Sequence, residues 1–67
     1  MKLYFQNSKG AERFIADVEN EKDAMKHINK FCMERGFTIH YTRVWKTKDG
    51  TTVVDVSSHT EFFLIKP

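Results

Sequence analysis

Hydroxyl, imidazole and carboxylate side chains gather near the end of this 67-residue chain. They are Ser57, Ser58, His59 and Glu61, the residue types of a hydrolytic triad. Triad members usually meet through the fold rather than in sequence, and the nucleophile needs a strained elbow with oxyanion donors beside it. The segment has no such motif. We therefore expect a polar turn that leads into a strand, and no enzymatic activity.

Metal ligands are few and badly spaced. The histidines and the single cysteine are His27, His40, His59 and Cys32. No pair has the i, i+4 or Cys-x-x-Cys spacing of a metal site, and there is no Gly-rich phosphate loop. We expect neither a metal nor a cofactor, and we expect Cys32 to be a small core residue.

Three side chains at alternating positions form a candidate binding surface. Tyr41, Arg43 and Trp45 have the two-residue spacing that places side chains on one face of a β-strand. A hairpin register derived below adds Val53 and Asp55 to that face. These five residues are the candidate exposed sheet face for a protein partner, of which a second copy of the chain is the simplest.

A single-stranded nucleic acid is the alternative partner. Its candidate residues are Tyr41, Arg43, Trp45, Lys46 and Lys48, because aromatic rings stack on bases and cations neutralise phosphates. Eleven basic and nine acidic side chains leave a formal charge of only +2, which does not by itself argue for a polyanion partner. In the plainest interpretation, the rings are core or partner contacts and the lysines are solvated. We rank protein contact first.

One helix, predicted over residues 21–35, must position these elements. Asn20 is a suitable N-cap, and Asp23 stands three residues later, close to a capping box. Gly36 can end the helix in the left-handed conformation. At 100° per residue, one apolar arc contains Ala24, Ile28, Phe31 and Cys32, with Met25 at its edge.

The residues before the helix predict a β-hairpin. Residues 2–6 and 11–18 flank a type I turn from Asn7 to Gly10. The predicted pairs are Tyr4 with Phe14 and Leu3 with Ile15.

A second hairpin follows the helix. Residues 37–46 and 51–57 flank a turn from Thr47 to Gly50 that repeats the pattern of the first. The register pairs Val44 with Val54, Arg43 with Asp55, and Trp45 with Val53.

The last strand is predicted over residues 60–66. Four consecutive apolar residues, Phe62 to Ile65, are typical of a strand covered on both faces and therefore in mid-sheet. The sequence predicts a single α+β domain over residues 1–67, in the order β-β-α-β-β-β, with one helix packed on an antiparallel sheet.

The predicted helix is too narrow for the predicted sheet. Five strands at about 4.8 Å spacing make a sheet about 20 Å wide, whereas a helix covers about 10 to 12 Å. Half of one face and the whole opposite face must therefore be wet, curled on themselves, or covered by another chain. Because both faces carry aromatic residues, we expect a protein-binding domain that forms a homodimer or a larger assembly.

A family resemblance lies in the C-terminal third. Residues 58–63 read Ser-His-Thr-Glu-Phe-Phe, and Tyr41, Arg43 and Trp45 precede them. Over roughly residues 20–65 the chain resembles small uncharacterised proteins of phages and prophages of Gram-positive bacteria. That family has no assigned activity, so the resemblance transfers no catalytic residue. It implies a phage accessory protein that binds a host or phage macromolecule in the bacterial cytoplasm. The single cysteine gives no sign of an oxidising compartment, and no apolar run approaches about 18 residues, so we expect a soluble intracellular protein.

Overall fold

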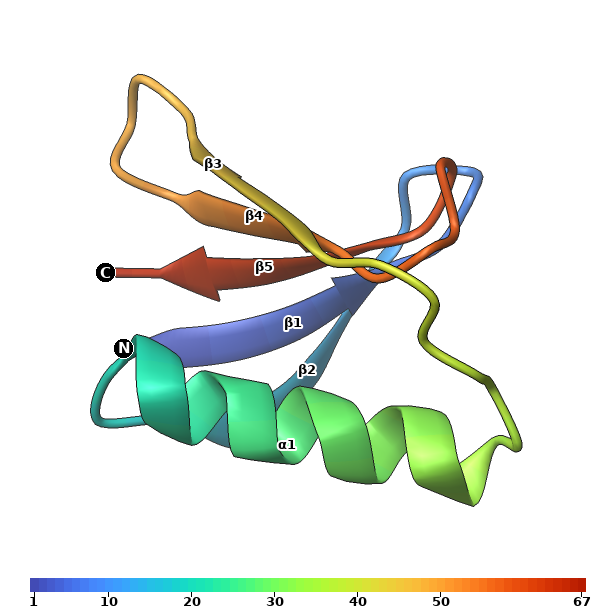
Figure 1. Cartoon of the computed structure of the whole chain (residues 1–67). Helices are drawn as coiled ribbons and strands as arrows, with labels where there is room; N and C mark the ends of the chain where they lie inside the picture. The colour runs from blue at the N-terminus through green and yellow to red at the C-terminus, as the bar shows by residue number, and fades with distance from the viewer.

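The computed structural model describes all 67 residues, as one helix and five strands (Figure 1). The elements are β1 (Lys2–Gln6), β2 (Glu12–Asp17), α1 (Glu21–Glu34), β3 (Arg43–Lys46), β4 (Thr52–Asp55) and β5 (Phe62–Lys66). All strand pairs are antiparallel. The predicted α+β class and the order β-β-α-β-β-β are confirmed. With 14 residues, α1 is neither long nor apolar enough to cross a membrane.

The strand order in the sheet is β2-β1-β5-β4-β3. The last strand of the chain is thus the central one, as its unbroken apolar run predicts, and it joins the two hairpins. Figure 1 shows the strands fanning out from β2 to β3, which is the strong twist of a small antiparallel sheet. The two edges of the sheet are β2 and β3.

Both predicted hairpin turns are present. Gly10 and Gly50 have φ of +86°, in the left-handed region that the turn requires. The β3–β4 register is the predicted one, with Val44 opposite Val54 and Trp45 opposite Val53. Alternating apolar residues and an oppositely charged pair made this register predictable.

The register of the first hairpin is only partly as predicted. Tyr4 lies opposite Phe14, but Leu3 lies opposite Ala16 rather than Ile15. A β-bulge between Leu3 and Tyr4 leaves Ile15 as the extra residue on β2. Nothing in this stretch, such as a glycine, marked the bulge in the sequence.

The segment before β3 is the largest departure from the predicted elements. A strand was predicted from residue 37, but β3 begins at Arg43. The backbone N–H groups of His40 and Tyr41 each donate to the Ser57 hydroxyl, at 2.7 Å. Because these amides bond to a side chain, residues 37–42 form a loop instead of extending the ladder.

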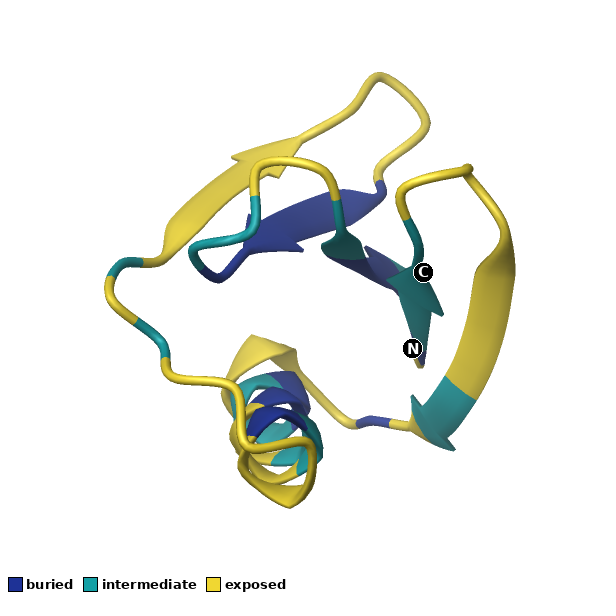
Figure 2. Cartoon of the chain, turned by 90° about the vertical axis from the view of Figure 1, so that its right-hand side faces the viewer, coloured by how far each residue is buried: buried dark blue, intermediate teal, exposed yellow.

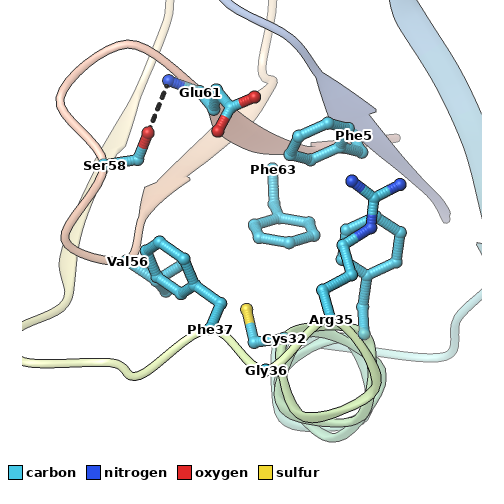
Figure 3. A pocket seen from close by; sticks show the side chains of 10 residues that line it. Phe5, Cys32, Arg35, Gly36, Phe37, Val56, Ser58, Glu61 and Phe63 are labelled. Atoms are coloured by element: carbon cyan, nitrogen blue, oxygen red, sulfur yellow. Dashed lines mark hydrogen bonds between the residues drawn. The ribbon is translucent and has the colours of Figure 1, made fainter.

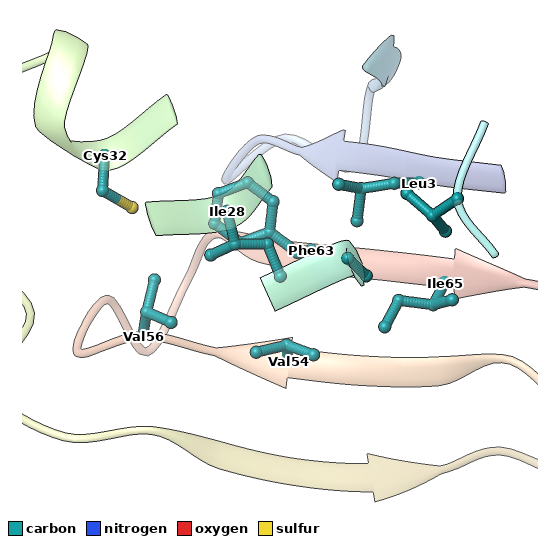
Figure 4. Packing of buried hydrophobic residues seen from close by; sticks show 9 residues of the cluster. Leu3, Ile28, Cys32, Val54, Val56, Phe63 and Ile65 are labelled. Atoms are coloured by element: carbon teal, nitrogen blue, oxygen red, sulfur yellow. The ribbon is translucent and has the colours of Figure 1, made fainter. Parts of the chain in front are cut away.

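Helix α1 begins and packs as predicted. The Asn20 side chain accepts a 2.8 Å hydrogen bond from Asp23 N, which satisfies one of the free amides of the first turn. Its buried stripe packs against one face of the sheet (Figure 4). The buried cluster is Leu3, Val18, Ala24, Ile28, Cys32, Val54, Val56, Phe63 and Ile65.

The face of the sheet opposite the helix is covered in large part by its own side chains. Val53 and Leu64 point away from the helix, yet each is only 7% exposed. The Trp45 ring packs edge-on against Phe62, with the ring centroids 5.8 Å apart. On the other side the Lys66 ammonium lies 4.9 Å from the Tyr4 ring. The sequence left three alternatives for this face: exposure to water, closure by its own side chains, or cover by another chain. The structure shows closure over the middle strands, while both edge strands stay mostly exposed (Figure 2).

Candidate functional site

The candidate residues on the sheet face meet in one cluster around Arg43. Its guanidinium carbon lies 5.9 Å from the Tyr41 ring centroid and 5.6 Å from that of Trp45. These distances are in the range of cation–π contacts. We call Tyr41, Arg43 and Trp45 the aromatic–arginine surface. Trp45 is 40% exposed and is the most accessible large ring on this part of the sheet.

Arg43 is held in place by Asp55, whose side chain is fully buried. Asp55 Oδ2 accepts hydrogen bonds from Arg43 Nη2 at 2.6 Å and Nε at 3.1 Å. Oδ1 accepts from the backbone N–H groups of Ser58 and His59, at 3.0 and 3.2 Å. Every charge-bearing oxygen therefore has donors, which is the condition for burying a carboxylate.

The electrostatics of the pair follow from these contacts. Burial acts to raise the pKa of Asp55, but the hydrogen bonds from Arg43, Ser58 and His59 outweigh it, and the pKa lies below its usual value. The hydrogen bond to Asp55 in turn raises the pKa of Arg43. The pair is ionised throughout the physiological range, so it acts as a fixed structural clamp between β3 and the β4–β5 loop.

The prediction that all five residues form an exposed face is wrong for two of them. Val53 and Asp55 are buried, with 7% and 0% exposure. The larger side chains of Trp45 and Arg43 on the edge strand fold over their cross-strand partners and cover them. Of the five predicted residues, only Tyr41, Arg43 and Trp45 are therefore accessible to a partner.

The loop after β4 supports this surface instead of forming a hydrolytic site. The Ser57 hydroxyl accepts from the amides of the 37–42 loop and donates to the carbonyl of Tyr41 at 3.0 Å. Ser58 Oγ accepts from Glu61 N. None of these bonds joins a serine to His59, whose ring lies 2.9 Å from the Tyr41 hydroxyl.

Sequence reasoning placed Ser57 and His59 in a turn but missed their role in fixing Tyr41. Both residues have positive φ, 72° and 68°, which non-glycine residues seldom adopt. No glycine or asparagine marks these positions, so the sequence carried no local signal. The strain is retained because Ser57 and Asp55 bond to the surrounding backbone.

The outer edge of β3 is the second feature of the site. All four of its residues are exposed, and only β4 pairs with it. Thr47 N donates to Thr51 O across the turn. Because ladder bonds alternate, the backbone groups of Trp45 and Arg43 face β4, and those of Val44 and Lys46 face outward. Val44 also exposes 46% of its surface on the helix side.

The other sheet edge, β2, has features that discourage pairing with a strand of another chain. Strand β2 contains the bulge at Ile15, and it carries charged residues at Glu12, Arg13 and Asp17. Bulges and charges discourage pairing with another chain. Strand β3 also carries charged residues, Arg43 and Lys46, at its two ends, but it has no bulge, and its two middle residues are apolar and exposed on opposite faces. The edge open to pairing is therefore β3.

The nucleic-acid residue set is divided between two faces. Lys46 pairs with Thr52 and lies on the face opposite Trp45, and Lys48 lies in the turn. The charge of Arg43 is compensated by Asp55, at 2.6 Å. The aromatic–arginine surface therefore lacks the row of free cations that follows a phosphate backbone.

Comparison with protein-family models, with curated proteins and with solved structures gave no match.

Proposed function

We propose that this chain is a protein–protein interaction domain that works through the β3 edge and the adjoining aromatic–arginine surface. The observation that carries the proposal is the open β3 edge, where the backbone groups of Val44 and Lys46 face outward and the apolar side chains of Val44 and Trp45 are exposed beside them. Adding a strand to such an edge supplies main-chain hydrogen bonds, and the flanking side chains supply specificity. The domain has the role that the phage resemblance implies, which is binding a macromolecule.

The simplest partner is a second copy, paired antiparallel through β3. The backbone groups of Val44 face outward, so a two-fold axis perpendicular to the sheet can pass between Val44 and Val44 of the second copy. With this axis, side chains at odd-numbered positions of both copies lie on the same face of the joined sheet. Arg43 then lies opposite Trp45 of the second copy. The pairing therefore removes Trp45 from water and adds a third aromatic contact for each guanidinium, beside Tyr41 and Trp45 of its own chain.

The association is weak by this account. Two four-residue strands bury far less than the roughly 1,200 Å² of a stable standard interface. Light scattering from about 10 µM to about 1 mM should show the apparent mass rising toward that of a dimer. A strict monomer at the highest concentration would rule out self-association and leave only a foreign partner.

Trp45 is the single tryptophan and reports directly on this surface. In the assembled state its emission should be blue-shifted, and it should move to longer wavelength on dilution as the interface opens. A short single-stranded oligonucleotide should leave the emission unchanged. Quenching by micromolar oligonucleotide, weakening steeply between about 50 and 200 mM salt, would favour nucleic-acid binding instead.

A further inference from the structure

A cavity of about 290 Å³ lies between the end of α1 and the loop after β4, away from the β3 edge (Figure 3). Its size is just below the usual range for ligand pockets, about 300 to 1,000 Å³. Its apolar walls are Phe5, Phe31, Cys32, Phe37, Val56 and Phe63, and its polar lining is Arg35, Gly36, Ser58 and Glu61. This volume is enough for one small aromatic ligand.

Local backbone geometry builds the wall at the helix end. Gly36 has φ of +67°, and its N–H donates to Met33 O while Phe37 N donates to Cys32 O. This pair of bonds is a Schellman motif, which normally brings the residue after the glycine against the last turn. Phe37 is thereby turned back toward Cys32, whose thiol points into the cavity in Figure 3. Phe37 nevertheless remains 39% exposed.

Arg35 brings an uncompensated positive charge to the cavity. Its guanidinium carbon lies 4.4 Å from the Phe31 ring centroid and 5.4 Å from that of Phe5. The chain's ion pairs are Lys2–Asp17, Arg43–Asp55 and Lys66–Glu12, and Asp23 is the carboxylate beside His27, so no carboxylate of the chain pairs with Arg35. Stacking on rings leaves the planar edge of a guanidinium, with its N–H donors, free for an oxyanion.

The charged groups of the lining indicate which kind of ligand the cavity favours. Arg35 already occupies faces of Phe5 and Phe31, so the cavity does not offer them to a second cation. Glu61 is the one acidic residue of the lining, and its side chain makes no hydrogen bond or ion pair in the structure. From the apolar volume and the unpaired guanidinium we infer that the cavity binds a small aromatic carboxylate, with the ring against Phe37 and Phe63 and the carboxylate on Arg35.

Binding is tested with 2-naphthoate as the probe. A ligand of this size in a partly open site should bind with a Kd of about 0.1 to 1 mM. The backbone amide NMR signals of Gly36 and Phe37 should shift on titration, while that of Gly10 should not. Saturating 2-naphthoate should also slow modification of Cys32, the only cysteine, by a disulfide reagent.

Two variants and two analogues test the chemistry. Arg35→Gln should weaken 2-naphthoate binding about tenfold, as for the loss of a charge-assisted hydrogen bond. The matched control, Arg13→Gln on exposed β2, should not change it. Glu61→Gln should tighten binding by removing a like charge. Neutral 2-naphthalenemethanol should bind more weakly than the carboxylate, and cationic 2-naphthylmethylammonium more weakly still.

Three results would overturn the inference. They are the absence of shifts at Gly36 and Phe37 at ~10 mM 2-naphthoate, ten times the weakest expected Kd, equal binding by wild type and Arg35→Gln, and tighter binding of the ammonium probe than of the carboxylate. Because the cavity is separate from the β3 edge, failure here leaves the proposed dimer intact, and loss of the dimer does not affect this site.

Discussion

At the scale of single residues, Asp55 connects more of the structure than any other side chain. It is fully buried, and its two oxygens tie Arg43 on the edge strand to the backbone of the β4–β5 loop. The sequence predicted its pairing with Arg43 because opposite charges fall at facing positions of the hairpin. It did not predict the burial, which depends on how two side chains of a neighbouring strand fold over the sheet.

Replacing Asp55 should destabilise the domain strongly. In Asp55→Asn an amide N–H₂ faces the Arg43 donors or the loop amides, whichever way it is turned, so at least one buried bond is lost. We expect a loss of about 2 to 3 kcal/mol in a urea titration, a large fraction for a domain with about 0.1 kcal/mol per residue. Asp17→Asn, which breaks the exposed pair with Lys2, should have a much smaller effect.

The same variant gives a test against pH. The folded-state pKa of Asp55 lies below its unfolded value. Its contribution is therefore complete above the unfolded pKa of about 3.9 and is lost as the pH falls through the folded pKa. The difference in unfolding free energy between wild type and Asp55→Asn should be largest near neutral pH and should shrink below about pH 4. A difference that stays constant down to pH 2 contradicts the assignment.

Gly50 carries a backbone requirement that the sequence showed clearly. Its φ is +86°, and a Cβ there would meet only Pro67 Cγ at an ordinary 3.6 Å. The cost of Gly50→Val is thus backbone strain, about 1 to 2 kcal/mol. Gly50→Asn, whose side chain tolerates the left-handed region, should lose much less. An unchanged melting midpoint for Gly50→Val would show that the turn is assigned incorrectly.

At the scale of elements, the features that depend on local sequence patterns were predicted, and those that depend on contacts between distant residues were not. The helix, both turns and the central position of β5 depend on local patterns, and the structure confirms them. The start of β3 and the Ile15 bulge were missed because they depend on contacts distant in sequence or on unmarked backbone geometry. Ser57, for instance, takes the amides of the 37–42 loop away from the ladder.

The N-cap offers a matched pair of variants on one helix. Asn20→Ala removes the acceptor of the Asp23 N–H and should cost about 1 kcal/mol. Asn29→Ala, at an exposed position inside the same helix, should leave stability unchanged or raise it slightly, because alanine has the higher helix propensity. Chemical denaturation of both variants measures the contrast. Equal effects would mean that Asn20 does not act as a cap.

At the scale of the whole molecule, most of the apolar surface of both sheet faces is covered within the single chain. The helix covers one face, while Trp45, Phe62, Tyr4 and Lys66 close over the other and bury Val53 and Leu64. The sequence left this closure as one of three alternatives, because the comparison of widths treats the sheet as flat and cannot choose among them. What remains open is an edge rather than a face, and the case for a partner therefore rests on β3.

The most direct measurement is the oligomeric state of an edge variant. The Val44 N–H points away from β4, so Val44→Pro removes an outward donor without breaking the hairpin, as proline is tolerated on edge strands. Val44→Thr keeps the donor and a β-branched shape and serves as the control. Sedimentation velocity at about 1 mM should show partial dimer for wild type and Val44→Thr, and monomer for Val44→Pro with an unchanged circular dichroism spectrum. Dimer that persists in folded Val44→Pro would contradict pairing through β3.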